Sequence, residues 1–326
     1  MSADADNACE TVPSQKVGVV GLGLLGRGVV TCLLSHNFQV VSYARQDAVR
    51  EQAREHVSHA IHELVERGHC SASIGGNWHE RYHEAIGYQD FASCDFVIES
   101  IVENLDAKES VFDQLEEVIG PDVPLASNTS ALPISLLQSR RRYPERLIGM
   151  HWAEPCHLTS FLEVIRGDRT SDATVYKTIE LGRQAGKDPT IVQKDVPGFI
   201  VNRLAYALYR EAFWLLEQGV ADVETIDRAF SNAISVWANI AGPFRWMDLT
   251  GIPGYAAVME RLLPELSRST EVPSRMKEIV ESGALGIANG RGFYQYSPEE
   301  AAHWEHRWTE NVWRVNEMRE ELGSRR

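Results

Sequence analysis

A glycine-rich segment near the N-terminus constrains the fold of this chain more than any other feature. Three glycines have the spacing G-x-G-x-x-G, directly after the apolar run KVGVV and directly before a segment whose apolar residues are spaced for a helix. In that setting the first glycine permits a tight turn, the second lets the backbone approach a phosphate, and the third lets the helix pack closely on the strand. The pattern predicts that a dinucleotide pyrophosphate binds at the helix N-terminus. The predicted loop consists of Gly21, Gly23, Leu24, Leu25 and Gly26.

Strands and helices alternate through the first part of the chain. Short apolar runs typical of buried strands are separated by segments with helical spacing, among them a long helix from Asp47 to about Gly68. Asp47 is suited to the N-cap of that helix, and another helix is expected from about Lys108 to Ile119. This alternation predicts an α/β domain built on a doubly wound, Rossmann-type parallel sheet. The expected strands are KVGVV, FQVVSY, CDFVIESIV, PLASNTS, LIGMHW and FLEVIRG.

The character of the chain changes at the segment DVPGF. From Gly198 onward the apolar residues have almost entirely helical spacing, and the last helix carries tryptophan and valine at three- and four-residue steps. We therefore predict a flexible tail over 1–15, a dinucleotide-binding domain over 16–195 and an all-helical second domain over 196–326.

Composition excludes several classes of partner. With 32 Lys and Arg against 46 Asp and Glu, the formal net charge is −14, so no basic excess is available to neutralise nucleic-acid phosphates. No apolar run approaches the roughly 20 residues that span a bilayer, and the polar, acidic start of the chain is unlike a signal peptide. Five scattered cysteines, an odd number without a C-x-x-C pair, favour a reducing, cytoplasmic location.

The end of the second expected strand bears on the choice between NAD and NADP. Dinucleotide sites usually place a carboxylate there, which accepts a hydrogen bond from the ribose 2′-hydroxyl. Here the strand is followed by Ala44 and Arg45, without a carboxylate. An arginine at this position is suited to the 2′-phosphate of NADP, whereas an Arg45 that is merely solvated would leave a site for NAD. The residues themselves lean towards NADP.

Beyond the glycine loop, the chain resembles the L-3-hydroxyacyl-CoA dehydrogenase family over nearly its whole length. So many matching segments in the family's order are far more specific than the glycine loop alone. They are GLGLLG, VIESIVENLDAK, SNTSALPI, MHWAEPCHLTSFLEVI, VPGFIVNR, AGPFRWMDLTG and the closing glycine–aromatic segment NGRGFYQY. The resemblance implies NAD as the usual cofactor, a small-molecule acyl-CoA or hydroxy-acid substrate, and a homodimer formed through the C-terminal domain.

The resemblance also points to four residues for the chemistry. His151 and Glu163, twelve residues apart on two expected neighbouring strands, fall where the family has its catalytic His–Glu pair. A histidine can accept a hydroxyl proton near neutral pH while hydride leaves, and a carboxylate can orient its ring. Ser130 and Asn202 match the family's hydroxyl and amide donors to the substrate. Taken singly, each residue has a structural alternative, such as a helix cap for Ser130 or a core position for His151.

Four further positions complete the expected site. Glu103 and Lys108, in ENLDAK, match residues that contact the cofactor in the family. Arg67 stands where the family has a lysine directed towards coenzyme A, although an isolated surface arginine is the simpler interpretation. Glu154 departs from the family, which has asparagine there to help hold the cofactor amide or the substrate. This departure leaves the identity of the substrate open.

No metal site is expected from the sequence. His79 and His83 fit the pattern H-E-x-x-H, but their segment follows two glycines and leads into an expected strand. Zinc sites of that pattern need both histidines on one face of a helix, together with a third ligand.

The leading prediction is an NAD(P)-dependent dehydrogenase that interconverts a 3-hydroxyacyl-CoA and a 3-oxoacyl-CoA. Two alternatives remain open. The segments NRLAYA and EAFWLLEQG are also similar to carnitine and gulonate dehydrogenases, which act on small free hydroxy acids, and a non-catalytic crystallin-like protein would keep the fold without turnover. Gly198 counts against a 6-phosphogluconate dehydrogenase type, which has a catalytic lysine four residues before the asparagine.

Overall fold

A computed structural model describes residues 15–322 of the chain. The chain forms two compact units, one ending at Asn202 and the other beginning at Arg203. Of the predicted tail over 1–15, residues 1–14 lie outside the described residues. All of the predicted site residues belong to the first unit.

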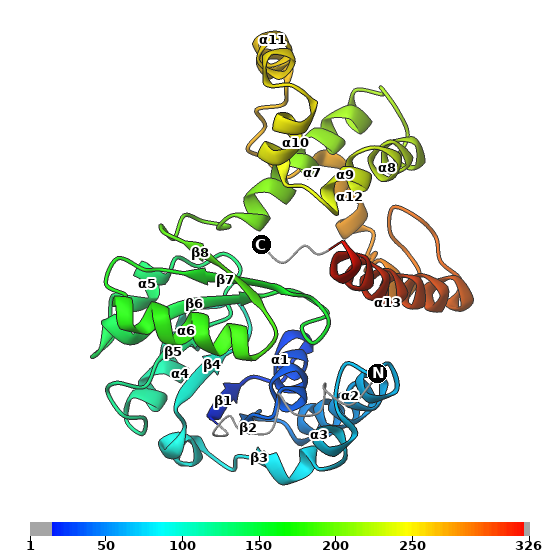
Figure 1. Cartoon of the computed structure of the whole chain (residues 1–326). Coiled ribbons are helices and arrows are strands. Elements are labelled where there is room, and N and C mark those ends of the chain that lie inside the picture. Colours follow the sequence, from blue (N-terminus) through cyan, green and yellow to red (C-terminus); the bar gives the residue numbers. More distant parts are fainter. Residues whose placement is uncertain (1–14, 323–326) are drawn as a thin grey trace. The chain divides into compact units, whose positions relative to one another are not determined.

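The first unit is built on one eight-stranded sheet with the order β3-β2-β1-β4-β5-β6-β7-β8 (Figure 1). Because β2 and β4 both pair with β1 in parallel, the carboxyl ends of these three strands lie at one edge. In a sheet of this kind, ligands bind beyond the carboxyl ends where the strand order reverses, which is here between β1 and β4. The strands are β1 (Lys16–Val20), β2 (Gln39–Tyr43), β3 (Tyr82–Glu84), β4 (Phe96–Glu99), β5 (Leu125–Ser127), β6 (Leu147–Trp152), β7 (Phe161–Ile165) and β8 (Asp188–Val192).

The last two strands run against the others. β7 pairs with β6 in the antiparallel sense, and β8 pairs in parallel with β7. The sequence analysis expects a parallel sheet throughout, but only residues 153–160 connect β6 to β7. A parallel crossover needs roughly a dozen residues or more, so this short connection allows only an antiparallel neighbour.

Helices cover both faces of the sheet. One apolar core joins the sheet to α1 (Leu24–Ser35), α2 (Asp47–Glu66) and α6 (Asp172–Gln184). A second core joins the opposite face to α4 (Leu105–Glu116) and α5 (Ile134–Gln138). The predicted Rossmann-type α/β fold is confirmed. Short connecting elements are α3 (Ala72–Gly76), η1 (Trp78–Arg81), η2 (Tyr88–Ser93) and η3 (Pro144–Arg146).

Two predicted helix starts differ from the structure. Asp47 is the first residue of α2 rather than its N-cap, a position that Gln46 occupies. The helix expected from about Lys108 begins three residues earlier, at Leu105, because the Asn104 side chain accepts a hydrogen bond from the backbone N–H of Ala107 at 2.9 Å.

The second unit is helical, which confirms the predicted change in character. The Asp222 side chain caps α8 by accepting a hydrogen bond from the backbone N–H of Thr225 at 2.8 Å. The elements are α7 (Val201–Glu217), which starts at the end of the first unit, α8 (Val223–Asn232), α9 (Ile234–Ala238), α10 (Pro243–Thr250), α11 (Ile252–Leu262), η4 (Leu263–Glu265), α12 (Ser274–Glu281), η5 (Ile287–Asn289) and α13 (Pro298–Glu321). Within residues 15–322, no helix has the length and apolar character needed to cross a membrane.

Candidate active site

The glycine loop connects β1 to α1 at the carboxyl edge of the sheet. Gly21 has φ +98°, and a Cβ there would lie 2.4 Å from the carbonyl oxygen of Ser100, so the position requires glycine. A Cβ at Gly26 would lie 2.0 Å from the carbonyl oxygen of Gly21, which explains how α1 packs so close to the loop. Gly23, the N-cap of α1, has open space around it and no side chain to occupy the first N–H groups of the helix. This arrangement fits the pyrophosphate of a dinucleotide.

The end of β2 lies beside the glycine loop. The backbone N–H of Gly21 donates to the carbonyl oxygen of Tyr43 at 2.8 Å. The next two residues differ in exposure, since Ala44 is buried and Arg45 is exposed. Arg50 donates to the carbonyl oxygen of Ala44 at 2.6 Å. Arg45 therefore presents an exposed cation at the strand end where dinucleotide sites recognise the ribose 2′ position.

Three side chains form a hydrogen-bonded chain at the carboxyl end of β6. The Nδ1 atom of His151 lies 2.9 Å from Oε2 of Glu163, directly opposite it on β7, and Nε2 lies 3.2 Å from the Ser130 hydroxyl. His151 is only 6% exposed, and its ring is enclosed by Phe161 and Phe199, whose ring centroids lie 5.7 and 5.8 Å away. The arrangement holds the imidazole in one orientation.

The charge state of Glu163 determines which nitrogen of His151 carries the proton. Burial alone would raise the pKa of Glu163, but hydrogen bonds from His151 and from the N–H groups of Val201 and Ile200 hold it below its ordinary value. An ionised carboxylate can only accept, so Nδ1 of a neutral His151 must be the protonated nitrogen. The unprotonated Nε2 is then the acceptor of the Ser130 hydroxyl in this structure, and its lone pair can accept a proton once a substrate hydroxyl takes that place, as a general base requires.

A turn with left-handed backbone brings two donors to Glu163. Gly198 has φ +79° and Phe199 has φ +50°, and a non-glycine residue in this region costs roughly 1–3 kcal/mol. The turn directs the N–H groups of Ile200 and Val201 to Oε1 of Glu163, both at 3.0 Å. The sequence analysis placed a domain boundary here but did not identify Phe199, whose only signal was its position after the glycine of DVPGF.

Asn202 and Ser130, the two predicted donors to the substrate, lie together in the structure. Asn202, in the first turn of α7, donates from Nδ2 to the carbonyl oxygen of Ser130 at 3.1 Å. Ser130 is not the N-cap of α5, because that helix begins at Ile134 and has Pro133 as its N-cap. Its hydroxyl contacts the imidazole of His151 instead.

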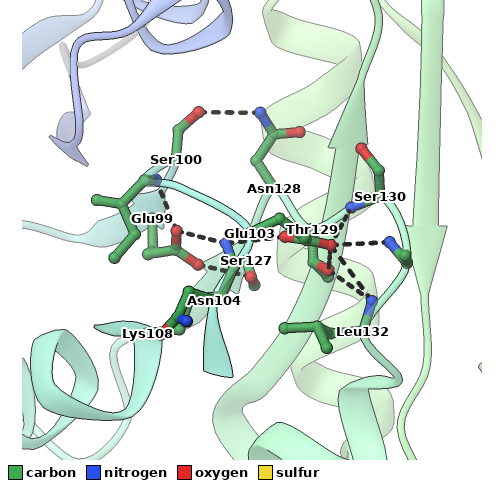
Figure 2. Close-up of polar contacts among 12 residues, drawn as sticks. Glu99, Ser100, Glu103, Asn104, Lys108, Ser127, Asn128, Thr129, Ser130 and Leu132 are labelled. Carbon is green, nitrogen blue, oxygen red and sulfur yellow. Dashed lines mark hydrogen bonds and ion pairs between the residues drawn. The ribbon is translucent and has the colours of Figure 1, made fainter. Parts of the chain in front are cut away.

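Glu103 and Lys108 belong to a network of charges, drawn in Figure 2, in which Lys108 and Glu99 are buried and Glu103 is 37% exposed. The Lys108 side chain is 0% exposed, and its ammonium lies 2.7 Å from Oε1 of Glu99 and 3.4 Å from Oε2 of Glu103. Oε2 of Glu99 accepts a hydrogen bond from the Ser127 hydroxyl at 2.6 Å. Lys108 thus lies under Glu103 rather than at the surface. Glu99 was not predicted as a site residue, although a carboxylate at the end of an apolar strand was a signal for it.

Glu154 lies on the connection after β6, half-buried beside α1. Its Oε2 atom lies 3.8 Å from Sγ of Cys156, and a Cβ added to Gly28 of α1 would lie 3.5 Å from that oxygen. Burial raises the pKa of Glu154 above its ordinary value, although the contact with Cys156 and the charge of Arg27 act in the opposite direction. The structure therefore has a carboxyl group with a raised pKa at the position where the resemblance implies an asparagine.

The other predicted site residues lie along α1 and α2. Leu24, the first residue of α1, is exposed, whereas Leu25 is partly buried against the core. Arg67, just beyond the end of α2, forms an ion pair with Glu63 at 3.1 Å.

The H-E-x-x-H segment does not form one helix. His79 lies in the short 3-10 helix η1, whereas His83 lies in the strand β3. The two imidazoles are therefore not placed on one helical face, which that zinc motif requires.

Comparison with known proteins agrees with this geometry. The family model for the 3-hydroxyacyl-CoA dehydrogenase NAD-binding domain matches residues 16–196, and the model for the C-terminal domain of the same family matches residues 198–296. A 5-formyl-3-hydroxy-2-methylpyridine 4-carboxylate 5-dehydrogenase of Mesorhizobium japonicum is 37% identical over 88% of this chain and 92% of its own length. A probable 3-hydroxybutyryl-CoA dehydrogenase of Deinococcus radiodurans is 34% identical over 86% of this chain and 100% of its own length.

Solved structures give the same result. The crystal structure of a 5-formyl-3-hydroxy-2-methylpyridine 4-carboxylic acid 5-dehydrogenase, described as an NAD⁺-dependent dismutase, is similar with a TM-score of 0.86 and 33% identity over 96% of this chain and 100% of that chain. The (S)-3-hydroxybutyryl-CoA dehydrogenase PaaH1 from Ralstonia eutropha is similar with a TM-score of 0.73 and 32% identity over 87% of this chain and 100% of that chain. The predicted family and the predicted nicotinamide cofactor are confirmed. The chain is an oxidoreductase that belongs to the 3-hydroxyacyl-CoA dehydrogenase family, with that family's NAD-binding domain as its first part.

Proposed function

We propose that this protein interconverts a 3-hydroxyacyl-CoA and a 3-oxoacyl-CoA by hydride transfer with a nicotinamide dinucleotide. The observation that carries the proposal is the chain Ser130–His151–Glu163, with separations of 3.2 and 2.9 Å. Such a chain provides a base for the hydroxyl proton, a donor for the substrate oxygen and a charge that stabilises the imidazolium.

In the oxidative direction, Nε2 of His151 accepts the proton of the 3-hydroxyl group as hydride leaves C3, the carbon that bears this hydroxyl. Glu163 keeps the proton of the neutral ring on Nδ1 beforehand and stabilises the imidazolium afterwards. The Ser130 hydroxyl and the Asn202 amide donate hydrogen bonds to substrate oxygens. In the reductive direction, protonated His151 returns its proton to the oxygen. A dinucleotide held by the loop of Gly21, Gly23 and Gly26 supplies the hydride acceptor or donor when bound.

A free carboxylic acid is the second candidate substrate. Its support comes from the Mesorhizobium japonicum relative, whose name gives a free pyridine carboxylate as its substrate, and from the replacement of the family asparagine by Glu154. Arg67 stands where the family has a lysine directed towards coenzyme A, but here its side chain forms an ion pair with Glu63. This pairing also supports the second candidate.

The two candidates are separated by comparing acetoacetyl-CoA with free acetoacetate, following NADH oxidation by its absorbance. We expect kcat/KM to be at least about 100-fold higher for the thioester, because contacts with the nucleotide part of the substrate can be used to lower the barrier. A preference for acetoacetate, or formation of NADH from NAD⁺ only with an aromatic hydroxy acid, would select the second candidate.

Arg45 leads to a prediction about the cofactor. We propose that the site accepts NADPH as well as NADH, because the exposed guanidinium of Arg45 can pair with the 2′-phosphate of NADPH. The substitution Ala44→Asp would place a carboxylate beside that phosphate, so we expect kcat/KM for NADPH to fall about 10-fold or more while that for NADH is retained or improved.

The control for this prediction is Arg45→Ala, which removes the cation without adding a charge and which we expect to weaken NADPH selectively. Steady-state kinetics with both cofactors measures the ratio. An unchanged NADPH-to-NADH ratio in both variants would show that Arg45 does not recognise the phosphate.

The helical second unit carries apolar side chains that the chain leaves exposed. Phe244 of α10 is 80% exposed, and Leu249 and Ile252 are 65% and 58% exposed. Exposed apolar surface of this kind marks association sites, and we propose that the chain forms a homodimer through this unit. For the wild-type protein, sedimentation is expected to give twice the mass of one chain. For Phe244→Glu it is expected to give the mass of one chain. A monomeric wild-type protein would contradict the proposal.

A further inference from the structure

The turn that carries Ser130 is held by a single carboxylate oxygen. Oε1 of Glu103 accepts a hydrogen bond from the Thr129 hydroxyl at 2.5 Å and from the backbone N–H groups of Ser130, Ala131 and Leu132 at 3.0, 2.9 and 3.3 Å (Figure 2). The turn precedes α5, whose N-cap, Pro133, offers no side-chain hydrogen bond. The N–H of Leu132 also donates to the Thr129 hydroxyl within the turn, at 2.9 Å, so Glu103 chiefly satisfies the N–H groups of Ser130 and Ala131.

The other oxygen of Glu103 joins a buried ion pair. Oε2 lies 3.4 Å from the Lys108 ammonium, which is held more closely by Glu99 at 2.7 Å. Both Glu99 and Lys108 are 0% exposed, so each charge must keep its partner. Glu99 is fixed in turn by the Ser127 hydroxyl at 2.6 Å and by the backbone N–H of Ile101 at 2.7 Å. The pair is thus a rigid anchor at the end of β4.

These contacts fix Ser130 from both sides of its backbone. Glu103 holds the N–H group of Ser130, and Asn202 holds its carbonyl oxygen at 3.1 Å. A serine side chain has only one torsion angle before its oxygen, so a fixed backbone restricts the hydroxyl to a few positions. In the structure that hydroxyl lies 3.2 Å from Nε2 of His151.

We propose that Glu103 is a positioning residue, which acts on the reaction through Ser130 and is itself anchored by Lys108 and Glu99. The proposal rests on the proposed function in taking Ser130 as a contact of the reacting oxygen. A carboxylate oxygen has about two lone pairs, and the four donors on Oε1 already saturate it. Oε1 of Glu103 therefore serves the geometry of the turn, and the side chain is 37% exposed, which is compatible with the cofactor contact that the family resemblance implies.

Two variants separate geometry from charge. Glu103→Gln keeps an oxygen that can accept from the turn but removes the charge, whereas Glu103→Asp keeps the charge but withdraws the oxygen by about one carbon–carbon bond, roughly 1.5 Å. In both variants Lys108 keeps Glu99 as its partner, so neither leaves a buried charge unpaired. We expect kcat at saturating NADH to fall about 10-fold in Glu103→Asp and less than about 3-fold in Glu103→Gln, since misplacement of a reacting group is costly.

The control is Asp106→Asn, which makes the same change in charge in the first turn of α4, where Asp106 is exposed. We expect it to leave kcat and KM unchanged. The opposite order, with Asp close to wild type and Gln strongly impaired, would show that the charge matters rather than the position of the oxygen and would overturn the proposal.

A double-mutant cycle tests whether Glu103 acts through Ser130. In a Ser130→Ala background, Glu103→Asp is expected to lower kcat by less than about 2-fold, because the hydroxyl that it positions is absent. The same fold-loss in both backgrounds, or an effect confined to KM for NADH, would instead assign Glu103 to direct cofactor contact.

A readout without turnover keeps this test separate from the proposed function. The imidazole ¹⁵N resonances of His151, assigned by their loss in His151→Gln, report the hydrogen bond at Nε2. Glu103→Asp is expected to shift them in the same direction as Ser130→Ala, while Asp106→Asn leaves them unchanged. Wild-type resonances in Glu103→Asp, together with shifted ones in Ser130→Ala, would overturn the positioning role. An inactive wild-type protein with the expected shifts would contradict only the proposed function.

Discussion

Replacing His151 with glutamine is expected to lower kcat for acetoacetyl-CoA reduction by about 1,000-fold, with NADH binding unchanged. General acid–base catalysis by a positioned side chain contributes roughly 100- to 10,000-fold, and His151 has the geometry for it. Its Nε2 atom is 3.2 Å from the Ser130 hydroxyl, and its Nδ1 atom is 2.9 Å from a carboxylate. Glutamine fills similar space but cannot carry a proton at neutral pH.

The measurement is steady-state kinetics together with quenching of tryptophan fluorescence by NADH, which reports cofactor binding apart from chemistry. His83→Gln is the matched control, because His83 lies in the strand β3 and its ring is exposed. We expect wild-type kcat from it. Full activity in His151→Gln would remove His151 from the mechanism and require another base, whereas a wild-type protein without turnover would leave the crystallin-like alternative.

Replacing Glu163 with glutamine is expected to lower kcat by about 100- to 1,000-fold, since loss of the orienting carboxylate costs up to roughly 10,000-fold in the Ser-His-Asp triad. A glutamine amide can donate to Nδ1, which allows the ring proton to move to Nε2 and leaves no base towards the substrate. The fold is expected to persist, because the side-chain oxygen can still accept from the N–H groups of Ile200 and Val201. Near-wild-type kcat in this variant would show that Glu163 does not set the tautomer.

Glu163→Gln is also expected to change how the stability of the fold depends on pH. Burial alone would raise the pKa of Glu163, but bonds from His151, Val201 and Ile200 hold it below the ordinary value of 4.5. A carboxyl group with a lowered folded pKa stabilises the fold above its unfolded pKa, and this contribution is lost as pH falls through the folded pKa. We therefore expect the difference in Tm between wild type and Glu163→Gln to shrink as pH falls below about 4.5. A difference that does not change with pH would contradict the charge assignment.

The family resemblance pointed to His151 and Glu163, and their closeness in space could be predicted because both belong to expected strands. His151 and Glu163 each lie within a short apolar run. Only residues 153–160 connect the two strands, so the strands must lie near each other. The structure places the two residues opposite each other in register on β6 and β7. The glycine spacing likewise predicted the turn after β1, where Gly21 has the positive φ that glycine allows.

Other parts of the fold could not be predicted because their sequences lack an apolar pattern. β8 contains Pro189 and is mostly exposed at the edge of the sheet, so neither alternation nor a continuous apolar run marks it. The buried positions of α6 include Thr174, Thr178 and Gly182, which give a helix no clear apolar stripe.

The contacts among Glu99, Glu103 and Lys108 were missed for a different reason. Sequence spacing shows neither that Lys108 turns inward to Glu99 nor that Glu103 faces the turn of Ser130, because these contacts join β4, α4 and the turn after β5. The resemblance supplied two of the three residues, yet it described them by contact with a ligand. Their mutual contacts only emerge from the three-dimensional structure.

The most direct test of the proposed reaction is the fate of a labelled hydride. Acetoacetyl-CoA is incubated with NADH that carries deuterium at both positions of nicotinamide C4, and the product is analysed by mass spectrometry. The account predicts 3-hydroxybutyryl-CoA with one deuterium at C3, formed by the wild type and lost in His151→Gln. Folded protein that binds the dinucleotide but yields no product, or a product without deuterium at C3, would contradict hydride transfer to a 3-oxoacyl thioester.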